Sequence, residues 1–156
     1  MRLFRVEPSR EQIEKIISLY SEGVDIAESV DSEFNLYSGY ITFNLGRAYF
    51  YRYELTGDKN DLTKFRRFMD KTLVIRKKWK EASDFPECFI NALSYEYFYA
   101  KSEYVKMLYK VSVYSKDNVI AEADKIIDGI DGYISKDAEL SKLFKIKSVC
   151  VNLKDL

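Results

Sequence analysis

The 156-residue chain contains no histidine and only two cysteines, Cys88 and Cys150. Without histidine, it lacks the commonest general base, the commonest metal ligand and the usual pH switch. The cysteines are not arranged as a Cys-x-x-Cys pair, so we expect neither a zinc site nor a disulfide scaffold. The sequence also has no nucleophile elbow, Walker loop or dinucleotide fingerprint. We therefore predict that the protein is not an enzyme and uses no cofactor.

Glycine and proline are also scarce, with 6 and 2 residues, too few for the many tight turns of an all-β sandwich. Because 47% of the residues are apolar, we do not expect a disordered chain. The longest uncharged run, residues 34–46, is too short to cross a bilayer, and the first residues do not resemble a signal peptide. We therefore expect a cytoplasmic protein with no membrane partner. The large charged fraction (32%) and the near absence of glutamine are typical of thermophiles.

Apolar residues at helical spacing predict an all-α fold of about six antiparallel helices in a single domain, residues 1–156. Residues 1–7 are predicted to form a short extended arm. At the start of the first helix, Ser9 and Gln12 have the spacing of a capping box. The other helix ends are marked by Gly57 after the second helix, Asn60 or Asp61 before the third, Pro86 in the first turn of the fourth, and Asp117 or Asn118 before the fifth.

A seven-residue segment occurs twice, as LGRAYFY at residues 45–51 and as LSYEYFY at residues 93–99. In the helix predicted around the first copy, the small residues fall on one narrow stripe: Ser38, Gly39, Thr42 and Gly46. Small side chains let a neighbouring helix approach closely, and the other positions are mostly aromatic or aliphatic on every side. We therefore predict that this is a central helix, covered on most sides by its neighbours.

Leu45, Gly46 and Tyr49, followed by Gly57–Asp58 and a second amphipathic helix, resemble the tetratricopeptide repeat. The resemblance implies that the small residue lets the two helices of a hairpin pack closely while the aromatic residue fills the gap beside it. In the second copy, Ser94 replaces the glycine. The first helix is longer than in that family, and the copies are 48 residues apart rather than 34. A compact bundle whose two long helices both use Tyr and Phe is the alternative architecture.

The resemblance implies a binding module, because stacked helical hairpins leave a concave face on which such proteins hold peptides or other proteins. We predict a non-enzymatic adaptor or assembly subunit that binds a protein, a peptide or a second copy of itself. Tyrosines suit such a surface because they are large and rigid and can donate a hydrogen bond. The candidate contact residues are Tyr51, Tyr53, Tyr95, Tyr99 and Tyr104.

An alternative function follows from residues 64–80, which hold eight basic residues and one acidic residue. On a helix most of these basic side chains share the face opposite the apolar arc, so an accessory subunit that binds nucleic acid is the alternative prediction. Arg76 instead falls inside the apolar arc, where it would pair with a carboxylate or extend toward solvent. The candidate anion-binding residues are Lys64, Arg66, Arg67, Lys71, Lys77 and Lys78.

The fifth predicted helix carries the opposite charge, with Asp124, Asp128 and Asp131 on one face. Their spacing does not match an EF-hand loop. In a homo-oligomer, this acidic face would meet the basic helix of another copy. The sequence does not identify a partner.

Overall fold

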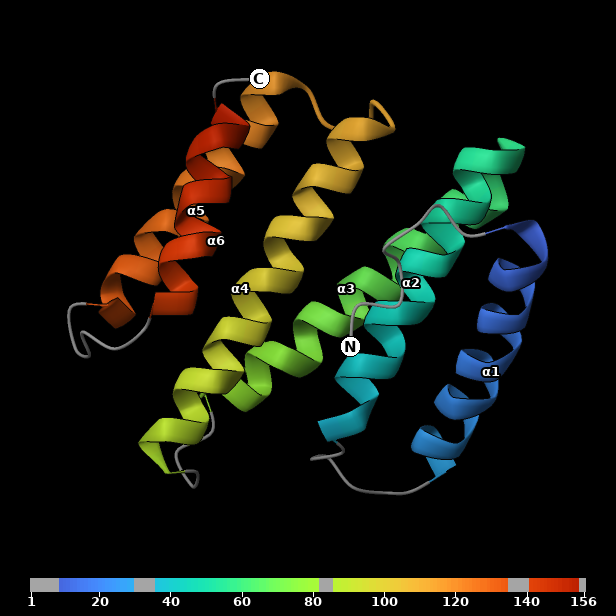
Figure 1. Ribbon diagram of the computed structural model, residues 1–156, viewed down its shortest axis with the longest axis horizontal. Coiled ribbons are helices and arrows are strands. Elements are labelled where there is room, and N and C mark those ends of the chain that lie inside the picture. Colours follow the sequence, from blue (N-terminus) through green and yellow to red (C-terminus); the bar gives the residue numbers. More distant parts are fainter. Residues whose placement is uncertain (1–8, 30–35, 82–85, 135–140, 155–156) are drawn as a thin grey trace. The chain divides into compact units, whose positions relative to one another are not determined.

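The computed structural model describes residues 9–29, 36–81, 86–134 and 141–154. Within these ranges the chain is helical and has no strand, which confirms the all-α prediction. None of the described helices has both the length and the apolar character needed to span a bilayer. The arm predicted for residues 1–7 lies outside the described residues. The helices are α1 (Arg10–Ser29), α2 (Leu36–Thr56), α3 (Lys59–Glu81), α4 (Glu87–Lys110), α5 (Lys116–Ile134) and α6 (Ser141–Lys154), as labelled in Figure 1.

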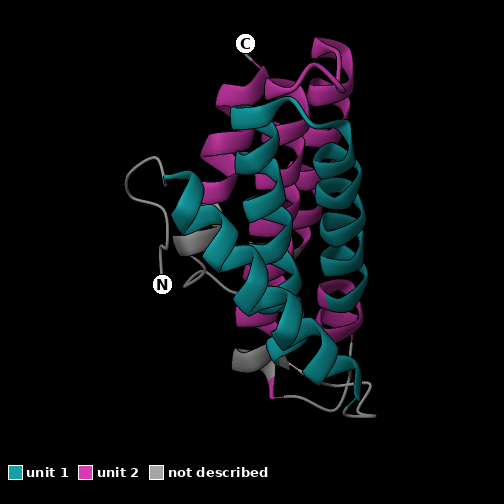
Figure 2. Cartoon of the chain, turned by 90° about the vertical axis from the view of Figure 1, so that its right-hand side faces the viewer, with its two compact units in different colours: residues 1–75 teal, residues 76–156 magenta. Residues whose placement is uncertain are grey.

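Contacts divide the chain into two compact units, unit 1 with residues 1–75 and unit 2 with residues 76–156 (Figure 2). The boundary falls within α3, so most of this helix belongs to unit 1 and its last turns belong to unit 2. The assignment of residues 1–156 to one domain stays a prediction.

Two predicted helix ends are confirmed. The backbone N–H of Ser9 donates to Oε1 of Gln12 (2.9 Å), and the backbone N–H of Gln12 donates to Oγ of Ser9 (3.3 Å), which is the reciprocal pattern of a capping box. Gly57, directly after α2, has φ of +72°, a left-handed conformation that costs glycine little.

The N-cap of α3 is Asp58, so the prediction of Asn60 or Asp61 is wrong. The carboxylate of Asp58 accepts a hydrogen bond from the backbone N–H of Asn60 (2.9 Å), and the helix already begins at Lys59. The connection after α2 is shorter than predicted, because Gly57 reverses the chain within a single residue. This places Asp61 inside the first turn, where its side chain is available for a different contact.

The N-cap of α5 is Ser115, which lies three residues before Asn118, the spacing of a capping box. Oγ of Ser115 accepts from the backbone N–H of Asn118 (3.2 Å), and Oδ1 of Asn118 accepts from the backbone N–H of Ser115 (3.2 Å). The prediction of Asp117 or Asn118 as the cap is therefore wrong, although Asn118 is the reciprocal partner. Pro86 directly precedes α4 rather than lying in its first turn.

In unit 1, α1 packs on α2, and the small-residue stripe of α2 lies against α3. A Cβ atom added at Gly46 would lie 3.0 Å from Sδ and 3.1 Å from Cγ of Met69. On the same stripe, Oγ1 of Thr72 donates to Oγ1 of Thr42 (2.9 Å), a buried hydrogen bond between the helices. The small residues of α2 therefore allow a close helix contact, as the sequence predicts.

Aromatic side chains fill the space beside this contact. The rings of Tyr49 and Phe68 are stacked at 5.7 Å, and the rings of Phe50 and Phe65 are 5.3 Å apart. Such ring pairs stabilise a core beyond the area that they bury. Their positions fix α3 along the middle of α2.

In unit 2, α4 packs on both α5 and α6, which also pack on each other. The helices approach closely at Gly129, where an added Cβ would lie 2.7 Å from the ring of Phe98. Arg76, on the last turns of α3, is 1% exposed and pairs with Glu96, whose carboxylate lies 3.2 Å away and whose carbonyl accepts a hydrogen bond at 2.6 Å. Of the two alternatives that the sequence leaves open for Arg76, pairing with a carboxylate is the one that the structure shows.

Candidate functional site

One side of α2 carries a row of tyrosine and polar side chains that its neighbours leave partly open. Tyr37 is 75% exposed and Tyr40 is 44% exposed. At helical spacing the row continues through three half-buried residues, and on a helical wheel it lies opposite the stripe that packs on α3. We call this row the tyrosine face, and it consists of Tyr37, Tyr40, Asn44, Arg47 and Tyr51.

The cation of the tyrosine face is held between aromatic rings. The guanidinium of Arg47 lies 5.7 Å from the ring centre of Phe43 and 6.0 Å from that of Tyr51. Both distances are within the range of cation–π attraction. Burial raises the pKa of the Tyr20 hydroxyl on α1, an effect that the charge of Arg47 opposes. The face therefore combines exposed tyrosines with an ordered arginine, and these residue types dominate protein-binding hot spots.

The five predicted tyrosines are divided between the two units. Tyr51 belongs to the tyrosine face, and Tyr53 lies half-buried near the end of α2. In unit 2, the rings of Tyr95 and Tyr99 stack on each other at 6.0 Å and are also half-buried. Tyr104 is only 7% exposed and belongs to the core. Of the predicted set, Tyr51 is the residue that belongs to the tyrosine face.

Sequence reasoning missed Tyr37 and Tyr40, which are the most exposed members of the face. A signal for them was present, because Tyr37, Tyr40, Asn44 and Tyr51 recur at helical spacing on the side opposite Gly46. The small-residue stripe marks the side where another helix packs, so the opposite side of α2 is the one for which this pattern predicts an exposed surface.

Three of the six predicted anion-binding residues of α3 are engaged in contacts within the chain. The ammonium of Lys64 lies 5.2 Å from the ring centre of Tyr49, Lys71 pairs with Glu28, and Lys77 lies 3.9 Å from Glu81. The hydrogen bond from Lys71 lowers the pKa of the Glu28 carboxyl, and the charge of Arg67 adds to this effect. Among the described residues, the exposed side chains of Arg66 and Lys78 form no ion pair. The basic face is therefore less available than its composition indicates.

The acidic face of α5 is largely neutralised inside unit 2. Asp124 pairs with Lys154 and Asp131 pairs with Lys147, both at 2.6 Å. Glu122 accepts hydrogen bonds from lysines on two sides, so its carboxyl pKa is lowered although burial acts to raise it. Few carboxylates of this face therefore remain unpaired for the predicted contact with the basic helix of another copy.

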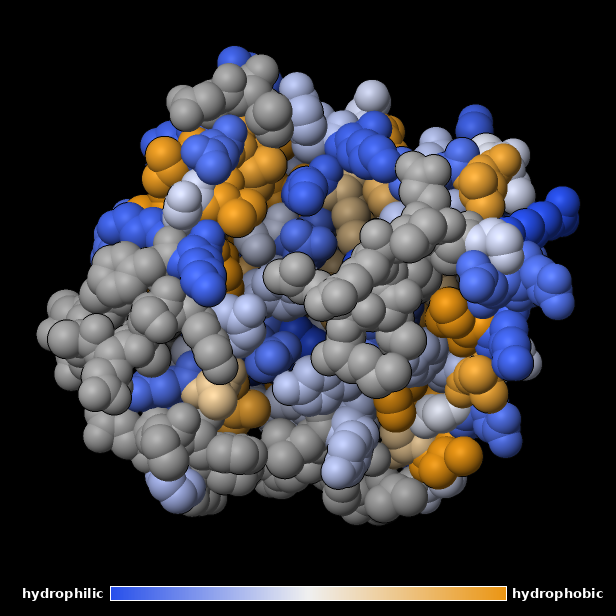
Figure 3. Space-filling model, viewed as in Figure 1, coloured by the Kyte–Doolittle hydropathy of each residue, from blue (hydrophilic) through white to orange (hydrophobic). Residues whose placement is uncertain are grey.

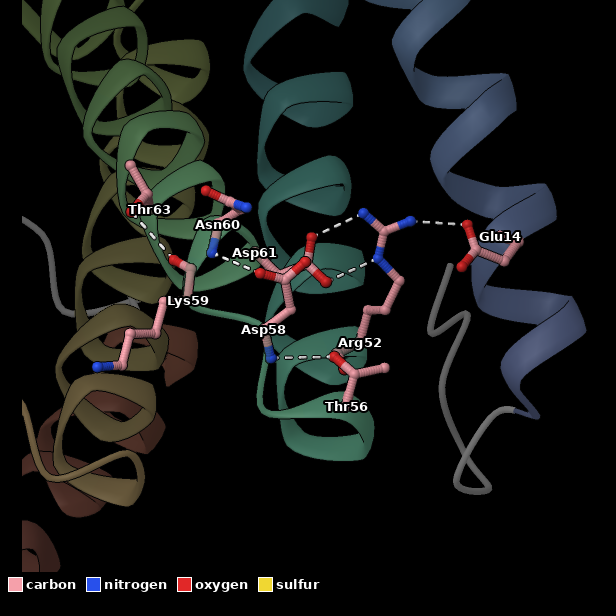
Figure 4. Close-up of polar contacts among 8 residues, drawn as sticks. All are labelled: Glu14, Arg52, Thr56, Asp58, Lys59, Asn60, Asp61 and Thr63. Carbon is pink, nitrogen blue, oxygen red and sulfur yellow. Dashed lines mark hydrogen bonds and ion pairs between the residues drawn. The ribbon is translucent and has the colours of Figure 1, made fainter.

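A polar cluster joins the three helices of unit 1 where α2 ends and α3 begins (Figure 4). Nε and Nη2 of Arg52 donate to the two carboxylate oxygens of Asp61 at 2.8 and 2.7 Å, and Nη1 donates to Glu14 at 2.7 Å. These hydrogen bonds, those to Asp61 above all, raise the pKa of the guanidinium, which burial would lower. A hollow of about 360 Å³ beside the cluster is lined by Arg10, Glu14, Arg52, Thr56, Asp58 and Asp61.

This cluster is arranged to hold helices together rather than to perform chemistry. Asp61 is 2% exposed, and both of its carboxylate oxygens accept hydrogen bonds from Arg52. Both oxygens of this carboxylate are therefore occupied by a contact between α2 and α3. Within the part of the chain that the structure describes, no group of three or more Cys, Asp or Glu side chains is placed to hold a metal ion.

Comparison with known proteins gives no relative for this chain: no family model, curated protein or solved structure matches it significantly.

Proposed function

We propose that the chain is a non-enzymatic protein-interaction module that binds a polypeptide segment along the tyrosine face of α2. The observation that carries this proposal is the exposure of Tyr37 and Tyr40 on a helix whose other sides are buried against α1 and α3. Large aromatic side chains at the surface of a folded helix lose little conformational freedom when a partner covers them. Arg47 supplies a charge that is already oriented, so a partner with an acidic group beside an apolar one suits the face.

The packing of α2 on α3 supports the tetratricopeptide-like character that the sequence indicates. Gly46 admits the side chain of Met69, and Tyr49 fills the adjacent space by stacking on Phe68. The resemblance implies these two packing roles: the small residue allows close approach, and the aromatic residue fills the gap beside it. Helical hairpins of this kind serve as scaffolds for binding rather than for catalysis.

The test is photo-crosslinking followed by a quantitative binding assay. Benzoylphenylalanine replaces Tyr37, the crosslinked protein is identified by mass spectrometry, and its affinity is measured with purified components. We expect the Tyr37→Ala/Tyr40→Ala variant to weaken binding at least about tenfold, because aromatic hot-spot residues have effects of this size. A matched control is Val149→Ala/Val151→Ala, which removes two exposed apolar side chains from α6. Equal affinities for the two variants would show that the tyrosine face is not the binding surface.

The second candidate function, binding of a nucleic acid backbone by α3, rests on the exposed side chains of Arg66, Arg67 and Lys78. We expect any such binding to be weak and strongly salt-dependent, because half of the six candidate basic side chains are already engaged in contacts within the chain. A mobility-shift assay with single- and double-stranded DNA and RNA at two salt concentrations tests it. Loss of a salt-sensitive shift in an Arg66→Glu/Arg67→Glu variant would support this candidate, and no shift at low salt would exclude it.

A further inference from the structure

The outer side of α1 presents charged and apolar side chains that nothing in the described residues covers. Leu19 and Ile26 are each 59% exposed. Glu11, Lys15 and Glu22 lie on the same side and form no ion pair among the described residues. Figure 3 shows hydrophobic residues between hydrophilic ones on the side where Figure 1 places α1.

The outer side of α3 has the complementary pattern. Val74 is 58% exposed at the centre of this side. Arg66 and Asp70 are exposed and form no ion pair among the described residues, and Lys77 has only the 3.9 Å contact with Glu81. Each of these residues lies on the single continuous helix from Lys59 to Glu81.

The two sides match in register as well as in charge. Along α1, Glu11, Lys15, Leu19 and Glu22 are separated by four, four and three residues. Along α3, Arg66, Asp70, Val74 and Lys77 have the same separations, with a constant offset of 55 residues. Because every α-helix rises by the same amount per residue, parallel helices bring each pair to the same height. The pairs are Glu11 with Arg66, Lys15 with Asp70, Leu19 with Val74, and Glu22 with Lys77.

The opposite orientation does not give this match. With Leu19 again opposite Val74 but the helices antiparallel, Lys15 would face Lys78, and Glu22 would face Lys71, which already pairs with Glu28. The first of these contacts is between like charges and is repulsive, whereas all three charged pairs of the parallel arrangement are attractive. The charge pattern therefore favours the parallel orientation.

We propose that α1 of one molecule packs parallel to α3 of a second copy, with Leu19 against Val74 and the charged pairs around them. The two contacting surfaces are different, so the contact is heterologous and each molecule keeps one open surface for the next copy. Exposed ion pairs contribute little each, so association is weak, needs high protein concentration and decreases with added salt. The contact does not involve the tyrosine face and is independent of the function proposed above.

Charge-swap variants of the full chain test the register. Glu11→Lys/Lys15→Glu reverses the pattern on α1, and Arg66→Glu/Asp70→Lys reverses it on α3, and neither pair of changes alters the net charge. The mean molecular mass is measured by sedimentation at low salt up to about 1 mM protein, a concentration that reaches weak contacts. We expect each variant alone to weaken self-association at least about tenfold relative to the wild type. The quadruple variant, with both patterns reversed, should associate like the wild type.

Three results would overturn the proposal: a wild-type chain that stays monomeric at low salt, single-surface variants that associate like the wild type, or a quadruple variant that is folded by circular dichroism but stays monomeric. Val149→Ser, which changes an exposed apolar residue on α6, is the control and should leave association unchanged. Tyr37→Ala/Tyr40→Ala should also leave it unchanged, which separates this contact from partner binding on the tyrosine face.

Discussion

Replacing Gly46 tests the close contact between α2 and α3, because a larger residue there changes the free energy of unfolding in two opposite ways: it favours the helix and it crowds the contact. Gly46→Ala removes the conformational cost of glycine inside a helix, a gain of about 0.5–1 kcal/mol. Its new Cβ lies 3.0–3.1 Å from Sδ and Cγ of Met69, a flexible side chain that can shift by a few tenths of an ångström. We expect the terms nearly to cancel, leaving the free energy of unfolding within about 1 kcal/mol of the wild type.

A larger residue at the same position removes this balance. Gly46→Val adds two methyl groups beyond the Cβ of alanine, and a shift of Met69 alone cannot accommodate them, because the surrounding core is filled by aromatic rings. We expect a loss of about 2–3 kcal/mol from overpacking. In a Met69→Ala background the added methyl groups enter the vacated space, so the same substitution should cost at least about 1 kcal/mol less.

The assay is urea unfolding followed by circular dichroism, with Gly23→Ala as the matched control. A Cβ at Gly23 would lie 3.5 Å from the side chain of Ile41, an ordinary contact, so helix propensity alone should stabilise this variant by about 0.5–1 kcal/mol. If Gly46→Val were as harmless as Gly23→Ala, or if its cost were the same with and without the Met69 side chain, the close contact would be refuted.

Three further predictions concern buried polar and titratable groups. Arg52→Met leaves the buried carboxylate of Asp61 without its partner and should cost about 3–5 kcal/mol by urea unfolding, whereas Glu14→Gln, at an exposed residue, should cost less than about 1 kcal/mol. Ser94→Ala should stabilise the protein by about 1 kcal/mol in a thermal melt, because the buried Ser94 hydroxyl has no hydrogen-bond partner among the described residues. Burial raises the pKa of the Cys150 thiol to about 11 from 9.0, so in a Cys88→Ser variant the thiol should resist Ellman's reagent until the protein unfolds. Because the folded pKa is the higher one, the stability that this buried neutral thiol contributes is complete below pH 9.0 and is lost between pH 9.0 and about 11, a decrease of up to about 3 kcal/mol that pH-dependent unfolding would measure.

The sequence predicts the helices better than it predicts their ends. Helical spacing of apolar residues identifies the six elements because burial on one side is required of any packed helix. The predicted N-caps of α3 and α5 are wrong by two or three residues. Several Asp, Asn and Ser residues lie near the start of each helix, and the side chain of any of them can cap a helix N-terminus. Which one is used depends on where the preceding turn ends, and at Asp58 that is decided by Gly57.

The candidate site is harder to predict, since it depends on which sides of each helix the neighbouring helices cover. α2 is apolar on nearly every side, so its hydrophobic pattern alone indicates burial everywhere and does not distinguish Tyr37 from Tyr49, and the position of the small-residue stripe is the one signal that separates them. In the structure, Tyr49 is buried against α3 and Tyr37 is exposed, a difference set by residues of other helices such as Phe68. The same holds for charged side chains. The sequence does not distinguish the six basic residues of α3 from one another, yet Lys71 forms an ion pair with Glu28 while Arg66 forms none among the described residues. In a helical protein of this kind, the residues available for binding are therefore those that packing and internal ion pairs leave exposed. Substitutions that keep the core intact, at Tyr37 or at Lys15, are accordingly the ones that separate binding from folding.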